Sequence, residues 1–182
     1  ADTLRMGLEP KSTTYLIYTG PFAYNIRNRL NFYAMEKMLN IRLNETVREK
    51  IGGVYSIGAY GWKDKYPNQS YVFTISFNSD PDQQKKIIEV IEQEIENLQE
   101  NGFGQSYLDK VNKQMLQEYR EEYKSNNFWL STFQFYDWIK EPYSNIYSKE
   151  QLHQQRTLKE IVNLARKTFL KRNYMFLTHL PE

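Results

Sequence analysis

The stretch Val47-Arg48-Glu49-Lys50-Ile51-Gly52-Gly53-Val54-Tyr55-Ser56 contains both the end of a helix and the beginning of a strand. Two glycines after a helical pattern end the helix, because glycine adopts the left-handed cap conformation at little cost. The alternating residues that follow, as far as Tyr60, are typical of a strand. The reversal can bring Arg48 and Tyr55 side by side as two hydrogen-bond donors aimed at one acceptor, which suits a peptide carbonyl. Propensity alone favours a structural interpretation, in which the arginine complements the helix dipole and the tyrosine packs at the start of a strand.

On both sides of this turn, the hydrophobic pattern predicts a mixture of strands and helices. The predicted strands are residues 13–18, 54–62, 71–78 and 174–180. The predicted helices are residues 23–51, 81–101, 106–123 and 158–170. An aromatic-rich segment at 128–138 has helical spacing and is interpreted as packing, and residues 142–148 are interpreted as a loop.

The strand predicted at 71–78 has the clearest pattern. Tyr71, Phe73, Ile75 and Phe77 face one way, and the residues between them are mostly polar. This is typical of a sheet with one apolar face and one more polar face. The order of elements is not the strict alternation of a doubly wound parallel sheet. We therefore expect an α+β fold, a mixed or antiparallel sheet of about four to six strands with helices packed on one face. Residues 1–182 are expected to form a single domain with no internal boundary.

Short polar motifs predict where three helices begin. The N–H groups of the first helical turn have no partner within the helix, and a side-chain oxygen just before the helix can accept from them. A proline at the first helical position has no N–H that would be left unpaired. The motifs are Asp80-Pro81, Ser106 with Asp109, and Thr157-Leu158-Lys159-Glu160.

Composition excludes several classes of function. A net charge of +2 without a basic stripe argues against nucleic-acid binding, and no apolar run is long enough to span a bilayer. The chain has no cysteine, and neither His153 nor His179 has further ligands at metal-binding spacing, so we expect this chain to bind no metal. No phosphate-binding glycine loop or nucleophile motif is present, so the chain carries no self-sufficient catalytic machinery. Its first residue is Ala1 rather than methionine, which favours a processed protein or a segment of a longer one.

The helix-to-strand turn resembles the Arg/Tyr motif in the C-terminal half of pitrilysin/insulinase-type metallopeptidases, the inverted zincins. In that family a long helix ends in arginine, and a short polar run, a glycine and a tyrosine follow. Arg48 and Tyr55 match this pattern with the family's seven-residue step. Further similarities lie at residues 16–21, 80–81, 98–102 and 127–130. The similarity is greatest to the large bacterial zinc proteases of the subgroup linked to coenzyme PQQ processing.

The resemblance implies a mitochondrial processing peptidase/insulinase-like domain, the last of a multidomain zinc endopeptidase. In such enzymes the N-terminal half carries H-x-x-E-H and binds the zinc that activates water, and the two halves enclose a chamber. By analogy, Tyr55 would donate to the scissile carbonyl oxygen of a peptide substrate, Arg48 would orient Tyr55 or hold the substrate backbone, and Gly52 and Gly53 would form the supporting turn. H-x-x-E-H is absent here, so zinc would belong to the N-terminal half, and this chain alone would be inactive.

Two alternatives stay open. The chain can be a separate subunit that pairs with a zinc-bearing partner chain, or a catalytically inactive structural or peptide-binding homologue. An upstream H-x-x-E-H in the same gene would favour the fused form. Family analogy alone suggests the bacterial cell envelope or periplasm as the compartment, and otherwise the cytoplasm.

Overall fold

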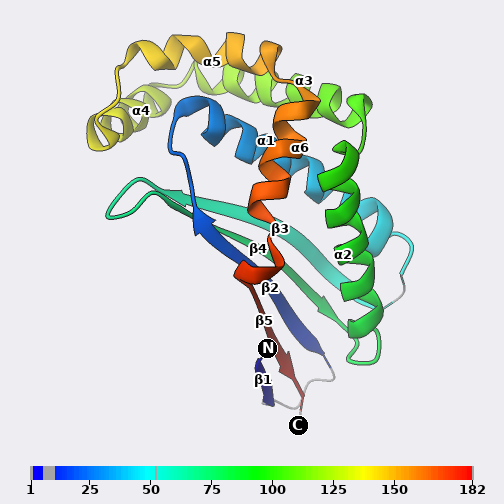
Figure 1. Ribbon diagram of the computed structural model, residues 1–182. Helices are drawn as coiled ribbons and strands as arrows, with labels where there is room; N and C mark the ends of the chain where they lie inside the picture. Colours follow the sequence, from blue (N-terminus) through cyan, green and yellow to red (C-terminus); the bar gives the residue numbers. More distant parts are fainter. Residues whose placement is uncertain (1, 6–10, 52, 182) are drawn as a thin grey trace.

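The computed structural model describes residues 2–5, 11–51 and 53–181 and shows a sheet covered by helices (Figure 1). The strands are β1 (Asp2–Arg5), β2 (Ser12–Pro21), β3 (Val54–Asp64), β4 (Ser70–Ser79) and β5 (Tyr174–Leu180). The helices are α1 (Ile26–Leu43), α2 (Gln84–Asn101), α3 (Gln105–Glu122), α4 (Asn126–Ile139), α5 (Ser144–Gln155) and α6 (Leu158–Thr168), with the short π-helix η1 (Asn44–Arg48) and the 3-10 helix η2 (Lys171–Asn173).

The sheet is mixed, which is one of the two forms that the sequence predicts. Its strand order is β1-β5-β2-β4-β3, with β1 parallel to β5 and the other neighbours antiparallel. Strand β3 therefore forms one edge of the sheet. The α+β prediction is confirmed.

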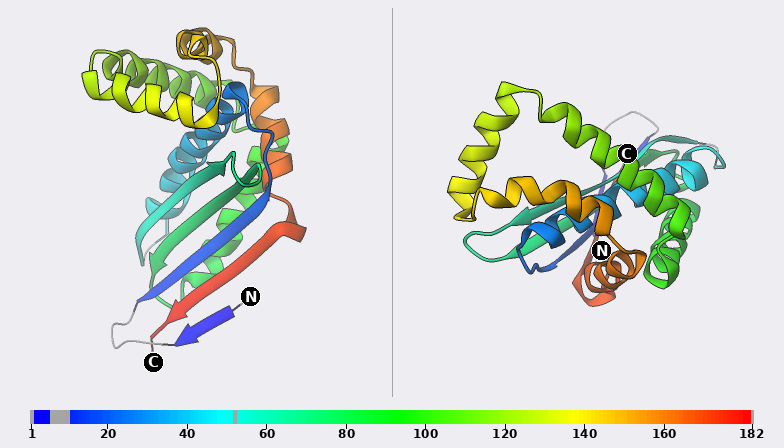
Figure 2. Two further views of the ribbon diagram at one scale, coloured as in Figure 1. Left: turned by 90° about the vertical axis from the view of Figure 1, so that its left-hand side faces the viewer. Right: turned by 90° about the horizontal axis from the view of Figure 1, so that it is seen from above.

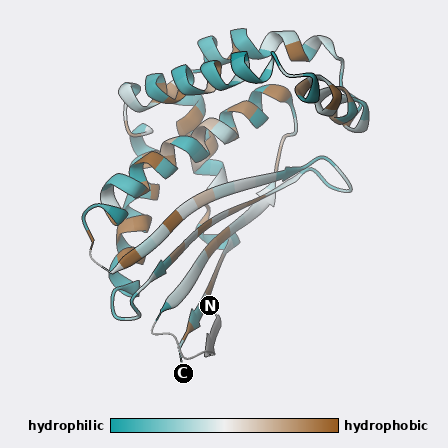
Figure 3. Ribbon diagram, turned by 180° about the vertical axis from the view of Figure 1, so that it is seen from behind, coloured by the Kyte–Doolittle hydropathy of each residue, from teal (hydrophilic) through white to brown (hydrophobic). Residues whose placement is uncertain are grey.

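The helices cover one face of the sheet, and the opposite face carries none of the described helices (Figure 2). Helices α1, α2 and α6 lie next to the strands, and α3, α4 and α5 form an outer layer beyond α1 (Figures 1 and 2). Figure 3 shows hydrophobic and hydrophilic residues alternating along the strands. On β4 this alternation leaves Phe73, Ile75 and Phe77 almost fully buried against the helices, while Val72 on the other face is 39% exposed.

Several predicted boundaries are confirmed. Strand β5 has the predicted bounds, and α2 ends at Gly102, which caps it in the left-handed conformation with φ 63°. At the start of α6, the side chains of Thr157 and Glu160 form the predicted capping box. The segment 128–138 is helical as its spacing indicates, although Phe133 and Trp138 are 43% and 52% exposed.

Other predictions of where helices begin are wrong, because the polar residues make other hydrogen bonds. Asp80 does not cap α2, which begins at Gln84; the Asp80 carbonyl instead accepts from Gln83 N in a turn. Helix α3 begins at Gln105, which puts Ser106 inside the first turn, and Asp109 accepts from the Gln105 side chain rather than from a backbone N–H.

The loop predicted at 142–148 and the helix predicted at 23–51 also need correction. Helix α5 begins at Ser144, so only the first part of that segment is a loop. Helix α1 begins at Ile26 after its cap residue Asn25, whose side chain accepts from Asn28 N. The short strand β1, which pairs with β5, was not predicted.

Candidate functional site

The Arg/Tyr turn lies where α1 ends and edge strand β3 begins, beside the start of α2 (Figure 1). The last residues before the turn form η1, which ends at Arg48. Single turns of π-helix are rare and occur frequently at functional sites. Val47 and Ile51 are buried and joined by a hydrogen bond of 2.9 Å from Ile51 N to Val47 O, so the turn is anchored to the core on both sides of Arg48.

Arg48 is exposed at this anchored position. Its side chain makes no hydrogen bond or ion pair with any residue that the structure describes. A guanidinium carries five N–H donors in a fixed fork and stays charged in proteins. Arg48 is therefore available to an acceptor that approaches from outside.

Gly53 closes the turn against the loop that follows β4. Its φ is +76°, a conformation that favours glycine, and its carbonyl accepts from Asp80 N at 2.9 Å. A Cβ at Gly53 would lie 2.5 Å from Oδ2 of Asp80, so any other residue would displace the carboxylate. Gly52, the other predicted turn residue, lies outside the described residues.

Tyr55 lies at an irregularity of β3. The register with β4 shifts between Val54 and Ser56, which leaves Tyr55 as an extra residue in the strand. Such bulges redirect a side chain and are over-represented next to active sites. The Tyr55 side chain is 52% exposed, and Lys11 Nζ lies 5.3 Å from the centre of its ring.

The phenol of Tyr55 is held by one specific partner. Its hydroxyl donates to Oδ1 of Asp80 at 2.6 Å. This hydrogen bond, with smaller contributions from desolvation and from the negative charge of Asp80, raises the pKa of Tyr55 above its ordinary value. The phenol therefore stays protonated and remains a hydrogen-bond donor well above neutral pH.

The structure thus brings Tyr55 together with Asp80 and places Arg48 on the same turn. No hydrogen bond joins Arg48 to Tyr55 in the part of the chain that the structure describes. Asp80 was missed as a site residue because its position before a proline suggested a helix cap. The signal that could have identified it is sheet register, since Val54, next to Tyr55, is paired with Ser79, next to Asp80.

The described residues do not form a metal site. Within residues 2–5, 11–51 and 53–181, no three side chains of histidine, cysteine, aspartate or glutamate lie close enough together to hold a metal ion. His153 is 3% exposed and lies beside Arg156. His179 is on β5, which is separated from β3 by β2 and β4 in the sheet. Among the described helices, none is both long and apolar enough to cross a membrane.

Comparisons with known proteins agree with this architecture. The family described as "Peptidase M16 inactive domain" matches residues 3–127. The "Probable zinc protease PqqL" of Haemophilus influenzae is 24% identical over 172 residues, which are 94% of this chain and 18% of that protein. The chain therefore spans about a fifth of the length of this curated relative.

Solved structures show the same fold. The periplasmic protease PqqL from Escherichia coli superposes with a TM-score of 0.89 at 15% identity, over 100% of this chain and 20% of that one. The structure of the first half of the same protease superposes with a TM-score of 0.77 at 13% identity, over 98% of this chain and 41% of that half. A similar fold is therefore present in the first half of that protease.

Proposed function

The chain belongs to the peptidase M16 family, as an inactive domain of that family, and from this premise we propose that it is the last, non-zinc-binding domain of a zinc endopeptidase. In this role residues 1–182 form one domain that helps to close the chamber around a peptide substrate. Arg48 and Tyr55 are its contacts with the substrate. The remainder of the enzyme, which we propose to be part of the same polypeptide, is the partner of this domain.

One observation supports this role more than any other. Tyr55 presents a protonated phenol at the surface from a bulged edge strand, on the turn that also carries an exposed arginine without a hydrogen-bond or ion-pair partner in residues 2–5, 11–51 and 53–181. Donors fixed in advance at a developing negative charge stabilise a transition state, because they need no reorganisation during the reaction. Tyr55 is proposed to donate to the scissile carbonyl oxygen, and Arg48 to orient Tyr55 or to hold the substrate backbone.

Asp80 gives this proposal a specific feature. A phenol has a single proton to donate, and that proton is directed at Oδ1 of Asp80. A substrate carbonyl must therefore take the place of Asp80 as the acceptor when the peptide binds. Asp80 keeps Tyr55 protonated and oriented until then, and the backbone of Asp80 is fixed by the hydrogen bond that its N–H donates to the Gly53 carbonyl.

Zinc is proposed to be held by another part of the enzyme. The described residues of this chain do not fit a zinc site, which needs three or four converging ligands. A similar fold in the first half of a periplasmic protease and the much greater length of the curated relative support a parent with a separate, zinc-binding half. A parent gene that encodes H-x-x-E-H upstream of this domain would support the fused form, whereas the motif on a neighbouring gene would support a separate subunit.

The test is kinetic and uses the parent enzyme. Tyr55→Phe and Arg48→Ala should each lower kcat/KM by about 10²–10³-fold, as expected when a transition-state donor is removed. Zinc content should stay at the wild-type level in both variants. Tyr15→Phe and Lys50→Ala are matched controls, since Tyr15 is a partly exposed tyrosine on the same sheet and Lys50 an exposed cation near the same turn. Unchanged kcat/KM in both Tyr55→Phe and Arg48→Ala would refute the assignment and leave only a structural role.

The compartment is proposed to be the bacterial cell envelope or periplasm. The support is that one structural relative is described as a periplasmic protease. Fractionation of cells that express the parent protein would test this, and recovery of the protein with a cytoplasmic marker would contradict it.

A further inference from the structure

A cavity of about 440 Å³ lies between α2, strand β2 and the segment that joins α6 to β5. This volume is within the range of about 300–1,000 Å³ that is typical of small-ligand sites. Its lining includes three aromatic rings, two carboxylates and one ammonium group: Tyr18, Phe169, Tyr174, Glu92, Glu96 and Lys171. None of the described residues that line it belongs to the Arg/Tyr turn, so the cavity is a separate feature of the fold.

The hydroxyl of Tyr18 lacks a protein partner in this cavity. The Tyr18 side chain is 5% exposed, and its ring centre lies 5.1 Å from that of Phe169 and 5.0 Å from that of Tyr174. Its hydroxyl makes no hydrogen bond with any residue that the structure describes, and unlike the enclosed hydroxyl of Tyr136 it keeps accessible surface. Buried polar side chains are hydrogen-bonded in the great majority of cases. The Tyr18 hydroxyl therefore indicates a partner that occupies the cavity.

Glu92 places a negative charge beside two phenols of the cavity. Burial raises the pKa of Tyr18, and Tyr174 and the charge of Glu92 raise it further. Burial, followed by the charge of Glu92, also raises the pKa of Tyr174. Both hydroxyls and the carboxylate can accept hydrogen bonds, and within the described part of the chain none of the three has a donor. The missing partner is therefore a donor.

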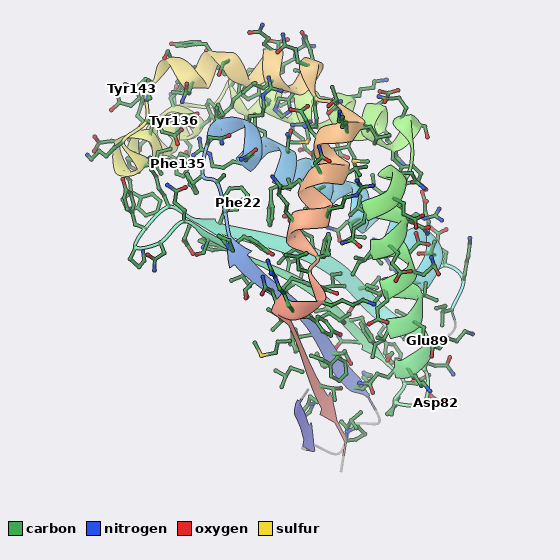
Figure 4. The ribbon with its side chains drawn as sticks, in the orientation of Figure 1. Phe22, Asp82, Glu89, Phe135, Tyr136 and Tyr143 are labelled. Atoms are coloured by element: carbon green, nitrogen blue, oxygen red, sulfur yellow. The ribbon has the colours of Figure 1, made fainter. Side chains whose placement is uncertain are left out.

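The charge pattern of α2 indicates that this donor is a cation. Glu89, Glu92, Glu96 and Glu100 follow one another at steps of three and four residues, so like charges are neighbours on the helix surface and repel one another. Figure 4 shows Glu89 at the surface of α2, about one turn before Glu92. None of the four carboxylates forms an ion pair with a described residue, and the exposed Lys171 across the cavity does not neutralise them. A cation bound beside Glu92 would relieve this repulsion.

The lining favours an organic cation over a metal ion. Among the residues that the structure describes, no three metal-ligating side chains meet, and a hard metal ion such as calcium needs six or more oxygen ligands. Aromatic rings attract cations, and Ile95, Phe169 and Leu170 offer apolar surface to a hydrocarbon chain. An alkylammonium group combines one positive charge and three N–H donors with an apolar stem.

From these observations we infer that the cavity binds an alkylammonium group, carried by the lysine side chain of a peptide or by a free amine. The ammonium donates to the Glu92 carboxylate and to the hydroxyls of Tyr18 and Tyr174. Glu96 adds a second negative charge, and the hydrocarbon stem packs on Phe169. This inference does not depend on the proposed function.

NMR titration of the purified protein tests this inference. The probes are the tripeptide Ala-Lys-Ala blocked at both ends, the same tripeptide with norleucine in place of lysine, pentylamine, and magnesium chloride. The lysine peptide should cause saturable shifts of the backbone amides of residues 92–99 and 169–174, which line the cavity. It should bind at least about tenfold more tightly than the norleucine peptide, because norleucine keeps most of the hydrocarbon but carries no charge.

Pentylamine distinguishes the two sources of the ammonium group. If pentylamine binds as tightly as the lysine peptide, the site accepts free amines. If the peptide binds more tightly, the site selects lysine within a polypeptide.

Four variants identify the groups that bind the cation. Glu92→Gln should weaken binding by about tenfold, because it removes the charge from one acceptor. Tyr18→Phe should weaken it by about two- to tenfold and should still unfold near the wild-type denaturant concentration, since the lost hydroxyl has no partner among the described residues. Lys171→Met removes a competing cation and should bind at least as tightly as the wild type. Glu89→Gln is the matched control, an exposed glutamate of the same helix outside the lining, and should bind as the wild type does.

Five results would overturn the inference: no saturable binding of either amine, equal affinity for the lysine and norleucine peptides, unchanged binding in Glu92→Gln, weaker binding in Lys171→Met, or binding of magnesium as tight as that of the lysine peptide. Arg48→Ala and Tyr55→Phe should bind the amines normally. Failure of this inference would therefore leave the proposed role of those two residues intact, and the reverse also holds.

Discussion

Replacement of His153 by glutamine should make the protein less sensitive to acid. His153 is 3% exposed near the end of α5, and its Nδ1 lies 3.2 Å from Nη2 of Arg156, which is 4% exposed. Arg156 can only donate, so His153 accepts at Nδ1 and is neutral. Burial, together with the positive charges of Arg156 and Lys149, lowers the pKa of His153 to about 4.

The magnitude follows from linkage between protonation and folding. The unfolded chain binds a proton at His153 with a pKa of about 6.5, whereas the folded chain binds it only near 4. Between these values the unfolded state holds more protons, so the free energy of unfolding falls as the pH falls through this window. The full difference corresponds to about 3 kcal/mol, and about 2 kcal/mol of it should be lost between about pH 7.5 and about pH 5.

Urea denaturation at these two pH values measures the effect. In His153→Gln the amide oxygen can still accept from Arg156, but the side chain does not titrate, so the variant should lose about 2 kcal/mol less than the wild type on acidification. His179→Gln, which changes the other histidine, should keep the wild-type acid sensitivity. Equal losses in the wild type and His153→Gln would show that His153 does not carry a depressed pKa, and would refute the reasoning.

Two further pairs of substitutions test the packing at β3 and the cap of α6. Gly61→Ala would place a Cβ 2.0 Å from the ring of the fully buried Phe32, so it should lower the free energy of unfolding by about 1–3 kcal/mol. The control Gly58→Ala, whose Cβ would have its nearest neighbour 3.2 Å away, should lower it clearly less. Similar losses in the two variants would argue against close packing at β3. Thr157→Ala should lower the free energy of unfolding by about 1 kcal/mol, because it removes the side-chain cap of α6. The control Ser125→Ala should lower it little, since the Ser125 side chain makes no cap hydrogen bond at the start of α4. Equal unfolding midpoints for the two variants would show that the α6 cap contributes nothing.

Local sequence patterns were sufficient for the elements with strong periodicity. Strand β4 was predicted because its side chains alternate between a buried and an open face, and that alternation is a property of any extended chain. The end of α2 at Gly102 and the capping box at Thr157 were predicted because each depends on groups within four residues along the chain. The turn that carries Arg48 and Tyr55 was predicted by the same local logic, whereas their proposed role rests on the family resemblance.

Predictions failed where a polar side chain had a choice of partners. Asp80 fits the pattern of a helix cap, but the fold offers it the phenol of Tyr55 and the backbone of Gly53, which are distant in sequence.

Strand β1 has only four residues, so its pairing with β5, at the other end of the chain, could not be recognised from periodicity.

The sequence by itself determined the class of fold and the position of the Arg/Tyr turn, because periodicity and glycine conformation act over a few neighbouring residues. Only the tertiary structure determined that Asp80 holds Tyr55, that the neighbouring pair His153 and Arg156 is buried, and that Arg29 pairs with Glu141. The first and the last join residues that are far apart along the chain, and the second depends on the elements that bury the end of α5. Their energies depend on burial and on distances across the fold, which the order of residues along the chain does not contain.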